Sequence, residues 1–120
     1  MRVLVVDDHP DTADALQMLL QSAGHTVRVA YDGVQALAVA AELVPEMAFI
    51  DIQLPDMSGY AVAKQLRKQS GRGVNLVGIT GGDARQLPFS ANFDQHAIKP
   101  ITAARLYQLI EVAREAIKAS

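Results

Sequence analysis

The stretch Val3-Leu4-Val5-Val6-Asp7-Asp8 decides the fold of this 120-residue chain. Its apolar residues run without alternation, a pattern typical of a strand that is buried on both faces of a sheet. Such strands occur in parallel sheets that helices cover on both sides. We therefore expect a buried strand that ends at the two aspartates.

Short apolar runs alternate with helical periods along the rest of the chain. Further strands are predicted at Thr26 to Ala30, Met47 to Ile50, Asn75 to Ile79 and Ala97-Ile98. Helices are predicted from Pro10 to Gly24, from Asp32-Gly33 to a point before Pro45, from Tyr60 to Gln69, and from about Thr102 to about Lys118. The second of these helices carries apolar residues on one side, namely Val34, Leu37, Ala38 and Ala41.

Strands that alternate with helices predict one parallel sheet with right-handed crossovers and helices on both faces. The second and fifth strands have the weakest patterns, so we place them at the edges. The fold class is then α/β, a doubly wound, flavodoxin-like (βα)5 sheet of order 2-1-3-4-5. Between Thr80 and Lys99, a helix could begin at Asp83, but Pro88 would stop or kink it.

Length and composition limit the class of protein. The chain has 120 residues, of which 50% are hydrophobic, which predicts one domain over residues 1–120 with a substantial core. The 11 Lys and Arg against 13 Asp and Glu give a net charge of -2, so no basic surface points to nucleic acid or to an anionic membrane. Without Cys there are no disulfides, thiolate metal sites or thiol nucleophiles. No signal peptide and no apolar run near ~18 residues is present, so we expect a cytoplasmic protein without membrane insertion.

The polar residues that end the predicted strands form the candidate site. In sheets of this kind ligands bind beyond the carboxyl ends of the strands, where the winding direction reverses, here between the first and third strands. The strand-ending residues are Asp7, Asp8, Asp51, Thr80 and Lys99. Each alone has an ordinary structural explanation, such as a helix cap or a strand-ending turn. Together they predict a site, because four strands bring them to one edge of the sheet.

The charges of this set indicate its chemistry. Two carboxylates at ~4 Å repel by about 1 kcal/mol in water and by ~4 kcal/mol at an effective dielectric of 20. Lys99 supplies one compensating charge, and a divalent cation would supply two. Oxygen ligands favour Mg²⁺, which keeps several waters and bridges to phosphate. A carboxylate beside Mg²⁺ and an ammonium is a suitable phosphoryl acceptor, and the Thr80 hydroxyl can donate to a transferring oxygen.

Two histidines have no comparable context. His9 and His25 have no second ligand at a metal-binding spacing, so both are predicted to be surface residues.

These residues resemble the receiver domains of two-component response regulators, of the chemotaxis-regulator type, over essentially the whole chain. The pieces that carry the resemblance are Val3 to Asp8, the run DIQLPDMSG from Asp51 to Gly59, Ile79-Thr80-Gly81, and Lys99-Pro100. The run from Phe93 to His96 is similar to receivers that are fused to hybrid sensor histidine kinases.

The resemblance implies a phosphorelay function. Asp51 would accept a phosphoryl group from a phosphohistidine of a sensor histidine kinase or a histidine phosphotransfer protein. Mg²⁺ would be bound by Asp8, Asp51 and the backbone carbonyl of Gln53, with Asp7 holding a metal-bound water. The domain would catalyse only its own phosphorylation and slow dephosphorylation, and would turn over no separate substrate.

The resemblance also implies a switch. Thr80 and Lys99 would bind the phosphoryl oxygens, and the Lys99-Pro100 bond would be cis. Phosphorylation would pull the Thr80 hydroxyl inward and turn a ring on the last strand, remodelling a surface that binds a downstream protein. That ring is His96 here, where the family usually has Tyr or Phe, so its coupling to Thr80 is open.

A second departure is the stretch from Gly81 to Gln95, which is shorter than the family leads us to expect and contains Pro88. The fourth helix is therefore predicted to be short or irregular. The residues that flank the site, Gln53 and Gly82, are predicted to tune the dephosphorylation rate.

Three alternatives stay open at this point. A haloacid-dehalogenase-like phosphatase also uses an Asp nucleophile after a strand, but needs a second Asp where Gln53 stands. A small flavin protein has the same strand order, but Asp7-Asp8 would repel a phosphate that arrives without a metal. The third alternative is a degenerate receiver that takes no phosphate, against which the complete set of five residues argues.

Overall fold

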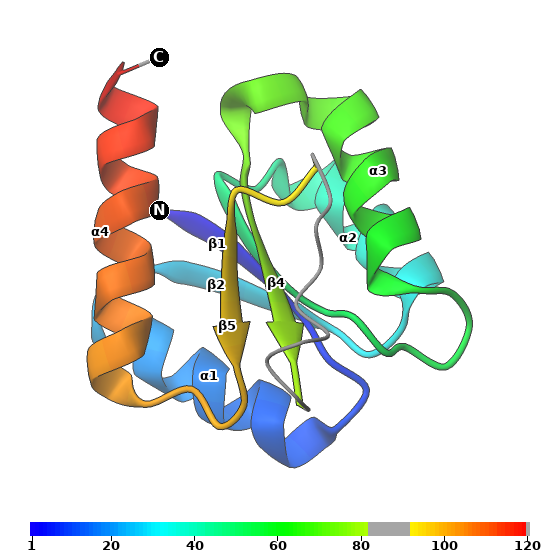
Figure 1. Ribbon diagram of the computed structural model, residues 1–120, viewed down its shortest axis with the longest axis horizontal. Helices are drawn as coiled ribbons and strands as arrows, with labels where there is room; N and C mark the ends of the chain where they lie inside the picture. Colours follow the sequence, from blue (N-terminus) through cyan, green and yellow to red (C-terminus); the bar gives the residue numbers. More distant parts are fainter. Residues whose placement is uncertain (82–91, 120) are drawn as a thin grey trace.

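The computed structural model of the protein describes residues 1–81 and 92–119. Five parallel strands form one sheet in the order β2-β1-β3-β4-β5, which confirms the predicted topology and both predicted edges (Figure 1). The strands are β1 (Arg2–Val6), β2 (Thr26–Ala30), β3 (Met47–Asp51), β4 (Asn75–Thr80) and β5 (Gln95–Ile98).

Helices cover both faces of the sheet. Helices α1 (Pro10–Ser22) and α4 (Ala103–Ala119) lie on one face, and α2 (Gly33–Leu43) and α3 (Gly59–Ser70) lie on the other (Figure 1). A short 3-10 turn, η1 (Gly71–Gly73), follows α3. The helix considered at Asp83, with Pro88 and Gly82, lies outside the described residues.

Strand β1 supplies side chains to both layers of the core. Val3 and Val5 pack in the cluster beneath α1 and α4, whereas Leu4 and Val6 pack in the cluster beneath α2 and α3. All four side chains are fully buried. The unbroken apolar run therefore predicted its environment correctly, because a strand between two helical layers has no wet face.

The residues that helix α2 buries most deeply are small ones, and they differ from the apolar side predicted from the sequence. Its buried residues are Gly33, Ala36 and Ala40, whereas Val34 is 65% exposed. Ala38 and Ala41 are exposed as well. Of the apolar side predicted from the sequence, Leu37 alone packs against the core, and the prediction is wrong for the other three residues. The helix is apolar nearly all round and small residues face the core, so hydrophobicity gives little contrast between its sides.

The prediction for His25 is wrong. The residue is 9% exposed, and its Nδ1 lies 3.0 Å from the amino group of Met1. Burial lowers the pKa of His25, and the positive charges of the amino terminus and of Arg114 lower it further. Sequence spacing contained no signal for this contact, because residues 24 positions apart form it.

Within the described part of the chain, no helix combines the length and the apolar character that crossing a membrane requires.

Candidate functional site

Four neighbouring strands end at the same edge of the sheet and bring the predicted site residues there. Asp7 and Asp8 follow β1, Asp51 ends β3, and Thr80 ends β4. Asp51 is paired in register with Ile79, so Thr80 lies one residue beyond it on the adjacent strand. The Lys99 N–H donates to the Thr80 carbonyl at 2.8 Å, which continues the β5 ladder to the lysine. The bond from Lys99 to Pro100 is cis, as predicted.

Lys99 joins two of the carboxylates. Its Nζ lies 2.8 Å from Asp51 Oδ2 and 2.8 Å from Asp7 Oδ2. Asp7 is fully buried, and Asp51 is 4% exposed. Burial by itself lowers the pKa of Lys99, but hydrogen bonds and attraction from Asp51 and Asp7 outweigh burial, so that the pKa is raised. The lysine is therefore a cation that partly balances the acidic cluster.

The loop after β3 holds the second oxygen of the Asp51 carboxylate. The backbone N–H of Gln53 donates to Asp51 Oδ1 at 2.9 Å. The Gly59 N–H returns to the Ile52 carbonyl at 2.8 Å, which closes the loop. Any Cβ at Gly59 would overlap the backbone of Asp51 and Ile52, so only glycine allows this close approach.

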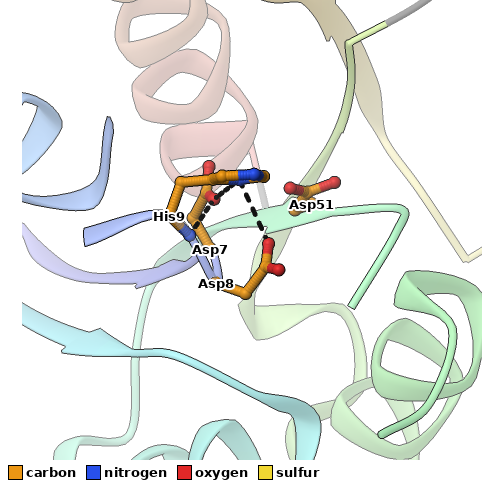
Figure 2. Close-up of side chains that lie close together, drawn as sticks. All are labelled: Asp7, Asp8, His9 and Asp51. Atoms are coloured by element: carbon orange, nitrogen blue, oxygen red, sulfur yellow. Dashed lines mark hydrogen bonds and ion pairs between the residues drawn. The ribbon is translucent and has the colours of Figure 1, made fainter. Parts of the chain in front are cut away.

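His9 lies against the cluster, which the sequence reasoning missed. Its backbone N–H donates to Asp7 Oδ1 at 2.9 Å, and its ring Nδ1 lies 3.1 Å from Asp7 Oδ1 and 3.2 Å from Asp8 Oδ1. Figure 2 shows the ring beside the carboxylates. The side chain is 66% exposed, so the predicted surface location is confirmed. Metal-ligand spacing did not reveal this location of His9. The only sign of it in the sequence was that His9 directly follows Asp7-Asp8.

The cluster has the donor set of a hard divalent cation. Ligand atoms of Asp7, Asp8, His9 and Asp51 lie within 4.8 Å of one another. The Oδ1 atom of Asp8 is buried and accepts no hydrogen bond, and its ion pair with His9 exists only when that ring is protonated. Carboxylate oxygens of this kind suit Mg²⁺, which binds through one or two carboxylates and keeps several waters.

A cavity of about 440 Å³ opens at the cluster. It is lined by Asp8, His9, Asp51, Gln53, Leu54, Pro55, Gly81 and Lys99. The carboxylates, the ammonium and the β3–α3 loop therefore face one open space, into which a small anionic group and a metal ion fit.

His96 lies on β5, paired in register with Gly78 of β4. Its ring makes an edge contact with Phe93, with centroids 5.9 Å apart, and Phe93 makes a similar contact with Tyr60 at 6.0 Å. Its Nε2 is buried and has no hydrogen-bond partner among the described residues. The ring that stands in place of the usual Tyr or Phe thus packs against a second aromatic side chain.

Comparison with known proteins identifies the class. The sequence matches the family described as response regulator receiver domain over residues 3–111. The chain belongs to this family. Receiver domains are phosphoacceptor signalling modules rather than conventional enzymes, which decides against the phosphatase and flavoprotein alternatives.

Individual relatives agree with this assignment. The sensor histidine kinase RcsC of Salmonella typhi is 32% identical over 121 residues, which cover 98% of this chain and 13% of RcsC. The chain therefore spans only a small part of that relative.

Solved structures also match. A CheY-like receiver domain protein from Methanospirillum hungatei JF-1 superimposes with a TM-score of 0.86 at 26% identity, covering 99% of this chain and 98% of that one. The response regulator TrrA of Thermotoga maritima, solved in complex with Mg(2+)-BeF, has a TM-score of 0.83 at 26% identity, over 93% of this chain and 97% of its own.

Proposed function

We propose that residues 1–120 form a single receiver domain in which Asp51 accepts a phosphoryl group from a phosphohistidine. The observation that carries the proposal is the position of Lys99, whose Nζ lies 2.8 Å from both Asp51 and Asp7 at the mouth of a cavity. A buried carboxylate with an ammonium beside it is equipped to attack phosphorus and to tolerate the charge that follows.

In the proposed reaction an oxygen of Asp51 forms a bond to phosphorus as the phosphorus–nitrogen bond of the donor breaks. The phosphohistidine ring of the donor carries a proton on its other nitrogen, so it leaves as neutral imidazole, and Asp51 becomes an acyl phosphate. The Lys99 ammonium, which donates a hydrogen bond to Asp51 in the unphosphorylated protein, then binds a phosphoryl oxygen. Thr80, at the end of β4, donates its hydroxyl to another phosphoryl oxygen.

We propose that Asp8, Asp51 and the backbone carbonyl of Gln53 hold Mg²⁺, with Asp7 binding it through a water. The buried Asp8 Oδ1 without a hydrogen bond and the three clustered carboxylates support this assignment. The Mg(2+)-BeF complex of the similar TrrA supports it as well. The ion supplies charge neutralisation for the phosphoryl oxygens.

The proposed donor is a sensor histidine kinase or a histidine phosphotransfer protein, in the cytoplasm. The similarity to part of RcsC, a sensor histidine kinase, supports this class of partner. We propose Thr80 and His96 as the switch residues that alter a surface for a downstream protein. The edge contact between the His96 and Phe93 rings supports this role, because through it a shift of β5 can be transmitted to Phe93.

Incubation with acetyl phosphate, with and without Mg²⁺, tests the proposal when it is followed by intact mass measurement. We expect one phosphoryl adduct that requires Mg²⁺ and is absent from the Asp51→Asn variant. An adduct that persists in this variant would place the acceptor elsewhere, and no adduct in the wild type would favour a degenerate receiver.

A further inference from the structure

The loop between β3 and α3, residues 52–58, is bound to the start of helix α2 by Asp56. Asp56 Oδ1 accepts the Gly33 N–H at 2.8 Å, and Asp56 Oδ2 accepts the Val34 N–H at 2.9 Å. The Gly33 hydrogen bond is the largest of the effects that lower the pKa of Asp56. A carboxylate at this position also interacts favourably with the positive end of the helix dipole.

A side-chain contact reinforces this pair of hydrogen bonds. A Cβ at Gly33 would overlap the Met57 side chain as it lies here, so the glycine leaves room for this side chain to pack against the start of the helix. Met57 is half-buried and packs on the cluster beneath α2 and α3. The middle of the loop is therefore tied to α2 both by charge-assisted hydrogen bonds and by packing.

The same loop carries the groups that border the phosphoacceptor. Gln53 donates its N–H to Asp51 Oδ1 at 2.9 Å, and Gln53, Leu54 and Pro55 line the cavity. Asp56 follows these residues directly. Three peptide units connect Asp56 to Gln53, whose backbone N–H contacts the Asp51 carboxylate.

We propose that Asp56 is a positioning residue for the phosphoryl-transfer site. Its two hydrogen bonds to the start of α2 fix the loop, and the fixed loop in turn sets the affinity for Mg²⁺ and the lifetime of the aspartyl phosphate. This inference rests on the proposed function of Asp51. Asp56 itself is exposed and lies outside the residues that line the cavity. It acts through Gln53.

The chain offers a matched control on the same helix end. Asp32 Oδ1 accepts the Gln35 N–H at 2.7 Å, a capping hydrogen bond to a residue of α2 itself. Asp56→Ala and Asp32→Ala each remove a carboxylate from the start of α2, so both lower the stability of the helix. Only Asp56→Ala also releases the loop.

Three measurements on the two variants and the wild type separate positioning from helix stability. Amide hydrogen exchange of residues 52–58 reports the loop, calorimetry reports Mg²⁺ affinity, and intact mass after removal of acetyl phosphate reports the adduct lifetime. For Asp56→Ala we expect faster loop exchange, an Mg²⁺ affinity weakened about tenfold and a changed lifetime, since partners that orient ligands typically have effects of about that size. For Asp32→Ala we expect each quantity to stay within about twofold of wild type.

Equal shifts in both variants, or no shift in Asp56→Ala, would overturn the inference. If Asp56→Ala does not fold, Asp56→Asn replaces it, because the amide keeps one acceptor and turns a donor toward the second N–H. This variant should show a smaller change in the same direction. A wild type that forms no adduct would contradict the proposed function. The amide hydrogen exchange of the loop and the Mg²⁺ affinity would still decide the role of Asp56, because neither measurement requires the adduct.

Discussion

The Lys99 ammonium lies 2.8 Å from Asp51 Oδ2, across 48 residues of sequence. Asp7 shares the same ammonium at 2.8 Å. In the unphosphorylated protein the single charge of Lys99 is thus shared between the proposed acceptor and its neighbour, and it offsets one of their two negative charges.

Replacing Lys99 should separate metal binding from phosphoryl transfer. In Lys99→Met we expect tighter Mg²⁺ binding, because a competing cation is removed from Asp7 and Asp51. Adduct formation from acetyl phosphate should slow by roughly 10- to 100-fold, because the developing phosphoryl charge loses its ammonium. Calorimetry and time-resolved intact mass check the two effects. Weaker Mg²⁺ binding in this variant would contradict the electrostatic account.

Gln53 should affect the lifetime of the adduct more than the metal. Its side chain is exposed at the cavity, whereas its proposed metal ligand is a backbone carbonyl that every substitution keeps. For Gln53→Ala we expect a dephosphorylation rate changed by about threefold or more, with Mg²⁺ affinity within about twofold, since groups beside a reacting water act on rate. Equal losses of both would count against this division.

Arg67 should contribute strongly to stability far from the site. Its guanidinium donates to the Gly71 and Val74 carbonyls at 2.8 Å, to the Asn92 carbonyl at 2.7 Å and to Asp94 Oδ2 at 2.7 Å. It therefore fastens the end of α3 to the segment that enters β5.

In Arg67→Met we expect the free energy of unfolding to fall by about 2–4 kcal/mol, because several hydrogen bonds to a charged group are lost. Urea denaturation measures this loss. Arg114→Met is the control, because Arg114 makes an exposed pair with Glu111 that contributes about 0.5 kcal/mol or less. Similar losses in both variants would contradict the role of Arg67.

His25 should make the protein less stable in acid. The folded state holds its pKa below the usual 6.5, so the unfolded chain binds a proton at pH values where the folded protein does not. Stability therefore falls as the pH decreases through 6.5 toward the folded pKa, and this effect is complete below it.

Urea denaturation of the wild type and of His25→Gln at a series of pH values between about 8 and 5 tests this dependence. We expect the wild type to lose more stability than the variant over this range. Parallel curves would show that another group is responsible.

The residues that end the strands made the site predictable from the sequence. The contact between the β3–α3 loop and helix α2 was not predictable in this way. The buried run Val3 to Val6 and the parallel topology were sufficient to bring Asp7, Asp51 and Lys99 to one edge of the sheet. Asp56 accepts a hydrogen bond from the Gly33 N–H, 23 positions away in the sequence. Because the donor is a backbone group, which every residue except proline has, the residue types give no sign of this contact.

The buried side of α2 escaped prediction for a related reason. Its buried residues are Gly33, Ala36 and Ala40, whose small size suits close packing but gives almost no hydrophobic contrast. His25 shows the same limit for a polar residue, because its burial depends on the position of the amino terminus and not on its neighbours in sequence.

The pairing of the Lys99 ammonium with a cluster of three carboxylates has a consequence for the order in which ligands enter the pocket. Among the residues that the structure describes, Asp7, Asp8 and Asp51 bring three negative charges to the cluster and Lys99 brings one positive charge, so these four ionised groups sum to a charge of minus two. A phosphorylated donor that came first would meet repulsion, whereas a doubly charged cation would be drawn in and would bring the sum to zero. Loading of the metal ion before the donor is thus the electrostatically favoured sequence of events.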